Sequence, residues 1–147
     1  MRTRSSGARV ALNLELSHGR HGAAARVELH ERPAGRVALV RLRGWIDDVA
    51  ERRLEQTLDD LAESGVSQLL LDCSQVRHID YRRVPALVDS LARFESRAGG
   101  TVVCGLSRYL RDLFRLAGCE PRLRFWPSAA ELLGRPAEPE PVGECAS

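Results

Sequence analysis

Residues 68–94 read QLLLDCSQVRHIDYRRVPALVDSLARF and contain the pattern that decides the fold. The run 69–71 is three consecutive leucines, which is typical of a strand buried on both faces. After Asp80 the apolar residues recur at helical spacing, at Val84, Leu87, Val88, Leu91 and Phe94. This stretch predicts a strand over 68–72, a loop over 73–80 and then a helix.

The segments before this stretch predict a hairpin and a helix. Two β-type runs, 27–31 and 36–42, flank a connection that contains Pro33 and Gly35, which favours a hairpin. Helical spacing then covers 47–63, where Asp47 or Asp48 can serve as the N-cap.

The segments after it continue the alternation of strands and helices. We expect a strand at 101–104, a helix from its N-cap Ser107 to Leu116, a strand at 122–126 and a short helix at 128–133. The predicted order is β-β-α-β-α-β-α-β-α. This order indicates the α/β class, with a mixed or largely parallel sheet and four helices packed on it.

The two ends of the chain differ from its centre. Residues 1–24 form an N-terminal extension in which apolar residues alternate from Val10 to Leu16, so it is either an extra strand or a partly disordered segment. Residues 135–147 are rich in Pro and Glu and predict a flexible tail. One folded domain over 25–134 remains.

The composition excludes several classes of function. The chain of 147 residues has 22 basic side chains, all of them arginine, and 20 acidic ones, for a net charge of +2. Without lysine, Schiff-base catalysis and a P-loop lysine are excluded. The near balance of charge argues against a nucleic-acid binder, and no apolar run is long enough to cross a membrane. We expect a cytoplasmic protein.

The cysteines indicate no metal site. They are Cys73, Cys104, Cys119 and Cys145, and they show neither a CxxC pair nor the Cys/His spacing of zinc sites. Cys73 and Cys104 follow apolar runs, as reduced core thiols do. We therefore expect no metal and no cofactor.

Several segments together carry a resemblance to a known family. They are VALVRLRGWID (37–47), QLLLDCSQVRHIDYRRVPAL (68–87) and GGTVVCGLSRYLRDLFRLAGCEPRLRFWPSAAELL (99–133). Their order and spacing resemble the STAS domain of bacterial anti-sigma factor antagonists over about residues 25–134. The most specific matches are Gly44 with Asp47, Asp72, Ile79–Asp80 and the turn 105–107.

The resemblance implies a non-enzymatic switch. In such proteins a Ser or Thr directly follows the aspartate at the start of the second helix, and a partner kinase phosphorylates it and so abolishes binding. Here that position is Tyr81, followed by Arg82 and Arg83, and no Ser or Thr occurs from Gln75 through Asp89. We therefore expect partner binding without the usual serine switch.

The candidate partner site comprises Asp80, Tyr81, Arg82, Arg83 and His78. Tyr and Arg are enriched at binding hot spots, although these residues can equally form a solvated first helical turn, and His78 a solvated loop. The two arginines can also hold an acidic partner or an anion.

Four further residues are expected to shape loops and turns around the site. Gly44 suits a turn, Asp47 a helix cap, and Asp72 a loop held by hydrogen bonds from backbone N–H groups, with Ser74 beside it. No catalytic set is expected, because Cys73 lacks a base and Asp72 and Asp80 do not form a convincing pair.

The favoured function is a regulatory module that binds an anti-sigma factor or a histidine-kinase-like serine kinase. The alternative is an accessory subunit of a transport ATPase or of another signalling complex. The oligomeric state stays open, with a homodimer as one option.

Overall fold

The structure is a computed structural model that describes residues 8–119 and 125–126. Its strands are β1 (Ala8–Ser17), β2 (Ala23–Arg32), β3 (Gly35–Ile46), β4 (Val66–Ile79), β5 (Gly100–Cys104) and β6 (Phe125–Trp126). Its helices are α1 (Asp48–Glu63), the short 3-10 turn η1 (Tyr81–Arg83), α2 (Val84–Arg97) and α3 (Arg108–Leu116).

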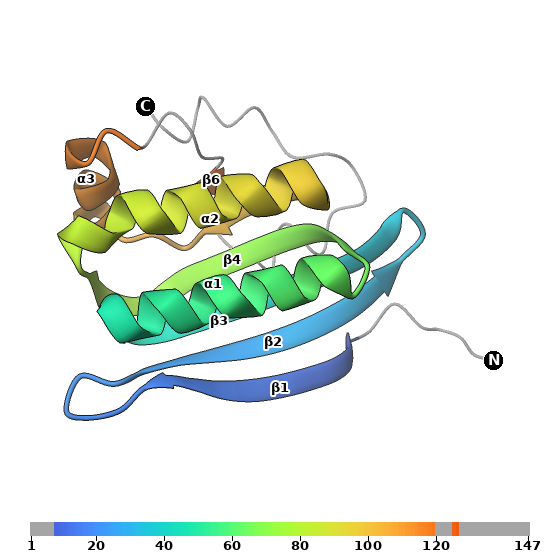
Figure 1. The fold of residues 1–147 in the computed structure, drawn as a ribbon, viewed down its shortest axis with the longest axis horizontal. Coiled ribbons are helices and arrows are strands. Elements are labelled where there is room, and N and C mark those ends of the chain that lie inside the picture. Colours follow the sequence, from blue (N-terminus) through green and yellow to red (C-terminus); the bar gives the residue numbers. More distant parts are fainter. Residues whose placement is uncertain (1–7, 120–124, 127–147) are drawn as a thin grey trace.

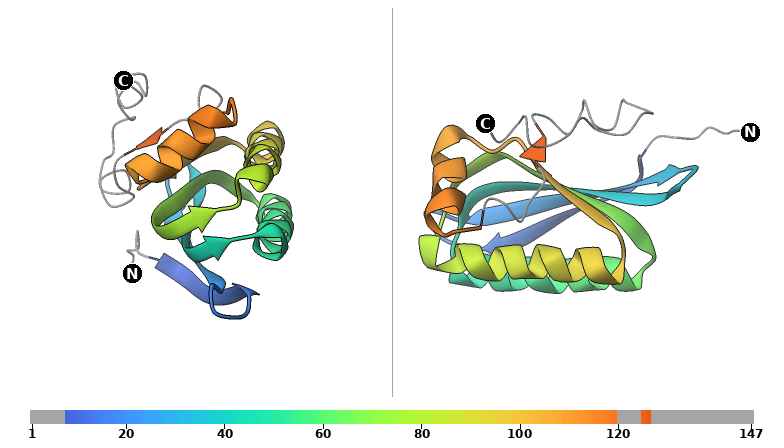
Figure 2. Two further views of the ribbon diagram at one scale, coloured as in Figure 1. Left: turned by 90° about the vertical axis from the view of Figure 1, so that its left-hand side faces the viewer. Right: turned by 90° about the horizontal axis from the view of Figure 1, so that it is seen from above.

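The strands form one mixed sheet in the order β1-β2-β3-β4-β5-β6. The first three strands pair antiparallel, and β3 to β6 pair parallel. Helices α1 and α2 lie side by side along one face of this sheet, and α3 lies at the end where α2 begins (Figures 1 and 2). The expected mixed α/β architecture is confirmed.

The predicted helical stripes form the core beneath α1 and α2. Every residue of the predicted α2 stripe is buried, from Val84 to Phe94, and Leu54 and Leu58 of α1 are fully buried. They pack on the helix-facing side of the strands, where Leu69 and Leu71 point. Burying each such side chain stabilises the fold by about 1.5–3 kcal/mol. On the opposite face, Leu70 belongs to a smaller buried apolar cluster, so the leucine triplet is buried on both faces as predicted.

The predicted loop 73–80 is wrong, because β4 continues to Ile79. The buried residues of this segment are Cys73, Val76 and Ile79, which are spaced by three rather than by two. The pairing with β3 explains the spacing: Arg41 faces Asp72, Arg43 faces Gln75 and Trp45 faces His78, with register shifts between these pairs. Each shift adds a residue to β4, a bulge that breaks the alternation by which a strand is recognised.

The predicted order of elements also differs from the structure. The residues 8–17 form β1, which pairs with β2 and precedes the two strands of the predicted hairpin. The part of the chain that the structure describes contains three α-helices and η1 rather than four helices. The predicted helix 128–133, most of the predicted strand 122–126 and the tail 135–147 lie outside the described residues.

Candidate functional site

The turn η1, which leads into α2, is capped by Asp80. The Asp80 carboxylate accepts a hydrogen bond from the backbone N–H of Arg82 at 3.0 Å, and the Arg82 guanidinium lies 3.4 Å from the same oxygen. The backbone hydrogen bond first, and then this guanidinium, lower the pKa of the Asp80 carboxyl. Asp80 therefore remains ionised and fixes the turn η1.

Tyr81 and Arg82 point outward. The Tyr81 ring is about half exposed and its hydroxyl donates to the carbonyl of Leu116 at 3.3 Å, which ties η1 to the end of α3. The side chain of Arg82 is 85% exposed. Both residues are therefore available to a partner.

Arg83 points inward and pairs with α1. Its guanidinium lies 2.8 Å from the Glu51 carboxylate and 3.3 Å from that of Asp48. Glu51 is fully buried, and burial together with the neighbouring Glu55 raises its pKa to about 7, against the opposing effect of Arg83. The side chain of Arg83 is 28% exposed and is held by α1, so it is not a freely solvated arginine, and its part in partner binding stays a prediction.

Four aromatic rings form a row across the same end of the sheet. We call His21, Trp45, His78 and Tyr109 the aromatic row. Successive ring centroids are 4.1, 4.9 and 5.8 Å apart, and His78 Nδ1 lies 2.5 Å from the Tyr109 hydroxyl. The row joins the β1–β2 connection, β3, β4 and α3, so residues far apart in sequence form one surface.

The aromatic row lies at the same end of the sheet as the turn η1. The N–H of Asp80 donates to the carbonyl of Ile46, the residue after Trp45, at 2.9 Å. Trp45 is 36% exposed and Tyr109 is half exposed. His78 belongs to β4 and contacts Trp45 and Tyr109, so the interpretation of His78 as a solvated loop histidine is wrong.

The expected loop and cap residues support this end of the sheet. Asp47 caps α1 by accepting from the N–H of Ala50 at 2.9 Å. Asp72 accepts from the N–H of Ser74 at 2.9 Å, although both residues lie within β4 rather than in a loop. Gly44 is not in a turn: it lies inside β3 with φ +92°, and the Gly22 carbonyl occupies the space that a side chain would need.

Sequence reasoning missed three residues of this region: Glu51, His21 and Tyr109. A glutamate one position from a helical stripe gives no signal of burial. His21 meets Trp45, and Tyr109 meets His78, only through the way the sheet and α3 pack, which the sequence pattern does not contain.

The described residues show no metal cluster and no activated nucleophile. Across the part of the chain that the structure describes, no group of three or more His, Cys, Asp or Glu side chains is placed to hold a metal ion. Burial raises the pKa of Cys73 well above its ordinary value and that of Cys104 to about 12, so both are protonated thiols. In residues 8–119 and 125–126, none of the helices has the length and apolar character of a membrane span.

The architecture and the residues together define a STAS domain. A family model described as the STAS domain matches residues 28–132, and the chain belongs to this family. No curated protein matches the chain.

Solved structures show the same fold. The anti-sigma factor antagonist SpoIIAA in its unphosphorylated form is 18% identical, with a TM-score of 0.58, and the match covers 73% of this chain and 92% of that one. An anti-sigma factor antagonist from Mycobacterium paratuberculosis is 23% identical, with a TM-score of 0.60 and coverage of 80% and 96%. A murine anion transporter of the solute carrier 26 family matches 84% of this chain with 22% of its own, at 14% identity and a TM-score of 0.56.

Proposed function

We propose that this STAS domain is a non-enzymatic regulatory module that binds a protein partner through Tyr81, Arg82 and the aromatic row, without a serine phosphorylation switch. The observation that carries the proposal is that four side chains at one end of the sheet, Tyr81, Arg82, Trp45 and Tyr109, are all exposed. Trp, Tyr and Arg are the residue types that dominate binding hot spots. On the family resemblance, we expect the partner to be an anti-sigma factor or a histidine-kinase-like serine kinase.

The geometry at Tyr81 supports the absence of the switch. The Tyr81 hydroxyl stands at the far end of a ring and is directed to the Leu116 carbonyl. A short hydroxyl at this position would instead lie beside the capped turn, where free N–H groups and the helix dipole favour a phosphate. A serine kinase that reaches this turn therefore finds no acceptor there.

Photo-crosslinking tests the surface. A photoreactive amino acid replaces Arg82 in one variant and Gln56, an exposed residue of α1, in the matched control. We expect the first variant to crosslink to an anti-sigma factor or kinase of the source cell, identified by peptide mass, and the control not to. Equal crosslinking from both positions, or from the control alone, contradicts the proposed surface.

Phosphorylation tests the switch separately. The captured kinase and ATP are incubated with the wild-type chain and with Tyr81→Ser, and intact mass is measured. We expect phosphate on the serine variant and none on the wild type, because the variant restores the short hydroxyl. Phosphate on Tyr81 in the wild type contradicts the absence of a switch but leaves the docking surface intact.

A further inference from the structure

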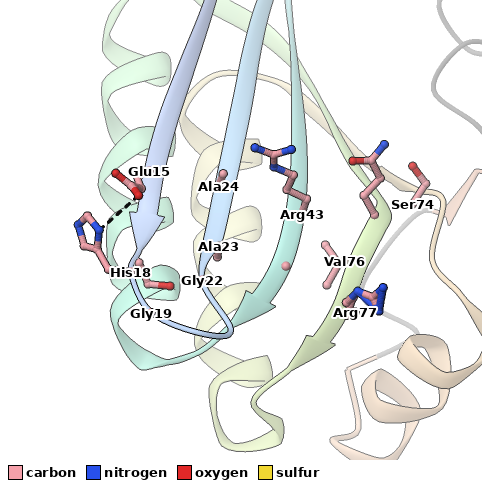
Figure 3. A pocket seen from close by; sticks show the side chains of 13 residues that line it. Glu15, His18, Gly19, Gly22, Ala23, Ala24, Arg43, Ser74, Val76 and Arg77 are labelled. Atoms are coloured by element: carbon pink, nitrogen blue, oxygen red, sulfur yellow. Dashed lines mark ion pairs between the residues drawn. The ribbon is translucent and has the colours of Figure 1, made fainter.

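A hollow of about 700 Å³ lies on the face of the sheet that α1 and α2 leave open. Figure 3 shows the side chains that line it, with both helices behind the sheet. Its floor consists of small residues: Gly22 of the β1–β2 connection, Ala23 and Ala24 of β2, and Gly44 of β3. Because these residues fill little space above the sheet, a depression remains where larger side chains would pack. Its volume is typical of small-molecule sites, about 300–1,000 Å³.

Two arginines without acidic partners line this hollow. Arg43 of β3 and Arg77 of β4 are exposed, and among the described residues no carboxylate pairs with either. The acidic residue of the lining, Glu15, lies on β1 and pairs with His18 at 3.3 Å (Figure 3). The β3 and β4 side of the hollow therefore carries an uncompensated positive charge, unlike Arg83, whose charge is neutralised.

Exposed polar side chains also line the β4 side of the hollow. Ser17 belongs to the lining, but its hydroxyl is buried beside Ala23, which lies in the core beneath α1 and α2, so this hydroxyl is not open to the hollow. Ser74 and Gln75 add exposed polar side chains on β4.

We propose that this hollow binds a small organic anion that carries a phosphate or carboxylate group. Arg43 and Arg77 contact the anionic group, since a guanidinium presents a planar set of donors that matches both groups in bidentate geometry. The proposal does not rest on partner binding at α2, because the hollow is built by β1, β2, β3 and β4.

Titration of the full-length chain, followed by backbone amide NMR shifts, tests the site. The probes are glycerol 3-phosphate and citrate, with glycerol as the neutral control, at constant ionic strength. We expect saturable shifts at Gly22, Gly44 and residues 74–77 with both anions and none with glycerol. Unsaturable shifts spread over arginines of the whole surface indicate non-specific ion binding and overturn the proposal.

Charge-matched variants assign the binding to the two arginines. We expect Arg43→Gln and Arg77→Gln each to raise the apparent Kd about tenfold or more, the effect of losing a charged hydrogen bond. Arg53→Gln removes the same charge from exposed α1 and leaves the Kd unchanged. Equal effects from Arg53 and Arg43 overturn the assignment.

A third arm distinguishes a small anion from an acidic segment of a protein. In this arm the probe is a glutamate-rich peptide. If the peptide produces the shifts and neither glycerol 3-phosphate nor citrate does, the small-ligand proposal is overturned. Tyr81→Asp separates this site from the partner surface: we expect the variant to lose partner binding and to keep the Kd for glycerol 3-phosphate.

Discussion

The two faces of the sheet use arginine in opposite ways. On the helix-covered face, Arg83 extends from the start of α2 to the buried Glu51 of α1, and its charge is matched inside the protein. On the open face, Arg43 and Arg77 border a hollow and have no acidic partner among the described residues. The difference shows that residue type and position in a motif do not define the role of an arginine. Arg82 and Arg83 are adjacent in sequence, yet Arg82 is exposed on the surface and Arg83 forms an ion pair with a buried carboxylate.

The largest effect is expected on the helix-covered face. At about pH 8, where Glu51 is mostly ionised, Arg83→Gln leaves a buried carboxylate without its cation, and removal of one partner of a buried pair costs about 3–5 kcal/mol of unfolding free energy. Urea denaturation measures this loss. Arg82→Gln, at the neighbouring exposed position, changes stability by less than about 0.5 kcal/mol. The double variant Glu51→Gln/Arg83→Gln recovers part of the loss; equal losses in all three variants would falsify the interior role of Arg83.

The second effect is a pH dependence that has its origin in Glu51. Its pKa is about 7 in the folded protein, against an ordinary value of 4.5, so the folded state binds the proton more tightly than the unfolded chain. This contribution to stability is fully present below about pH 4.5 and is lost as the pH rises through about 7, by at most about 3.5 kcal/mol at about 1.4 kcal/mol per pKa unit.

Denaturation of the wild type and of Glu51→Gln at several pH values between about 5 and 8 measures this slope. We expect the variant to lack it. A wild-type slope that persists unchanged in the variant places its origin in another group.

The third effect compares two glycines near the open face. Gly44→Ala places a Cβ against the Gly22 carbonyl at a positive φ, and we expect a loss of about 2 kcal/mol or more. Gly19 also has a positive φ, but nothing lies within 4 Å of an added Cβ, so Gly19→Ala costs about 1 kcal/mol. Thermal unfolding distinguishes the two. Equal losses of stability mean that the contact with the Gly22 carbonyl adds nothing to the cost of Gly44→Ala.

The smallest effect on stability is expected at the aromatic row. Trp45→Ala removes ring contacts with His21 and His78, and the fold loses about 1 kcal/mol. The affinity for the partner, measured by calorimetry once the partner is identified, falls by about 2 kcal/mol or more, as for a hot-spot tryptophan. A larger effect on stability than on affinity assigns Trp45 to packing.

Elements with undisturbed periodicity could be predicted from the sequence. The stripe of α2 and the caps Asp47 and Ser107 are as expected, because helical spacing and side-chain capping depend on nearby residues. The extension of β4 to Ile79 could not be predicted, because its bulges arise from pairing with β3.

The candidate site was predicted less completely than the fold. Asp80, Tyr81 and Arg82 lie at the start of α2 as the motif implied, but the inward direction of Arg83 depends on the burial of Glu51 across the helix pair. The aromatic row depends on which residues the sheet and α3 place beside one another. Local patterns do not contain that information.

The pairing of β1 has a consequence for solubility. β1 covers the outer edge of β2 from His30 to Ala23, so the backbone donors and acceptors of that strand are satisfied within the chain. A ten-residue strand with an unpaired edge is a template for strands of other molecules. β1 is itself the edge strand, so residues 8–17 move the free edge of the sheet from β2 to β1. A chain shortened to begin after Ser17 also loses the buried Leu16 from the core, and we expect it to aggregate.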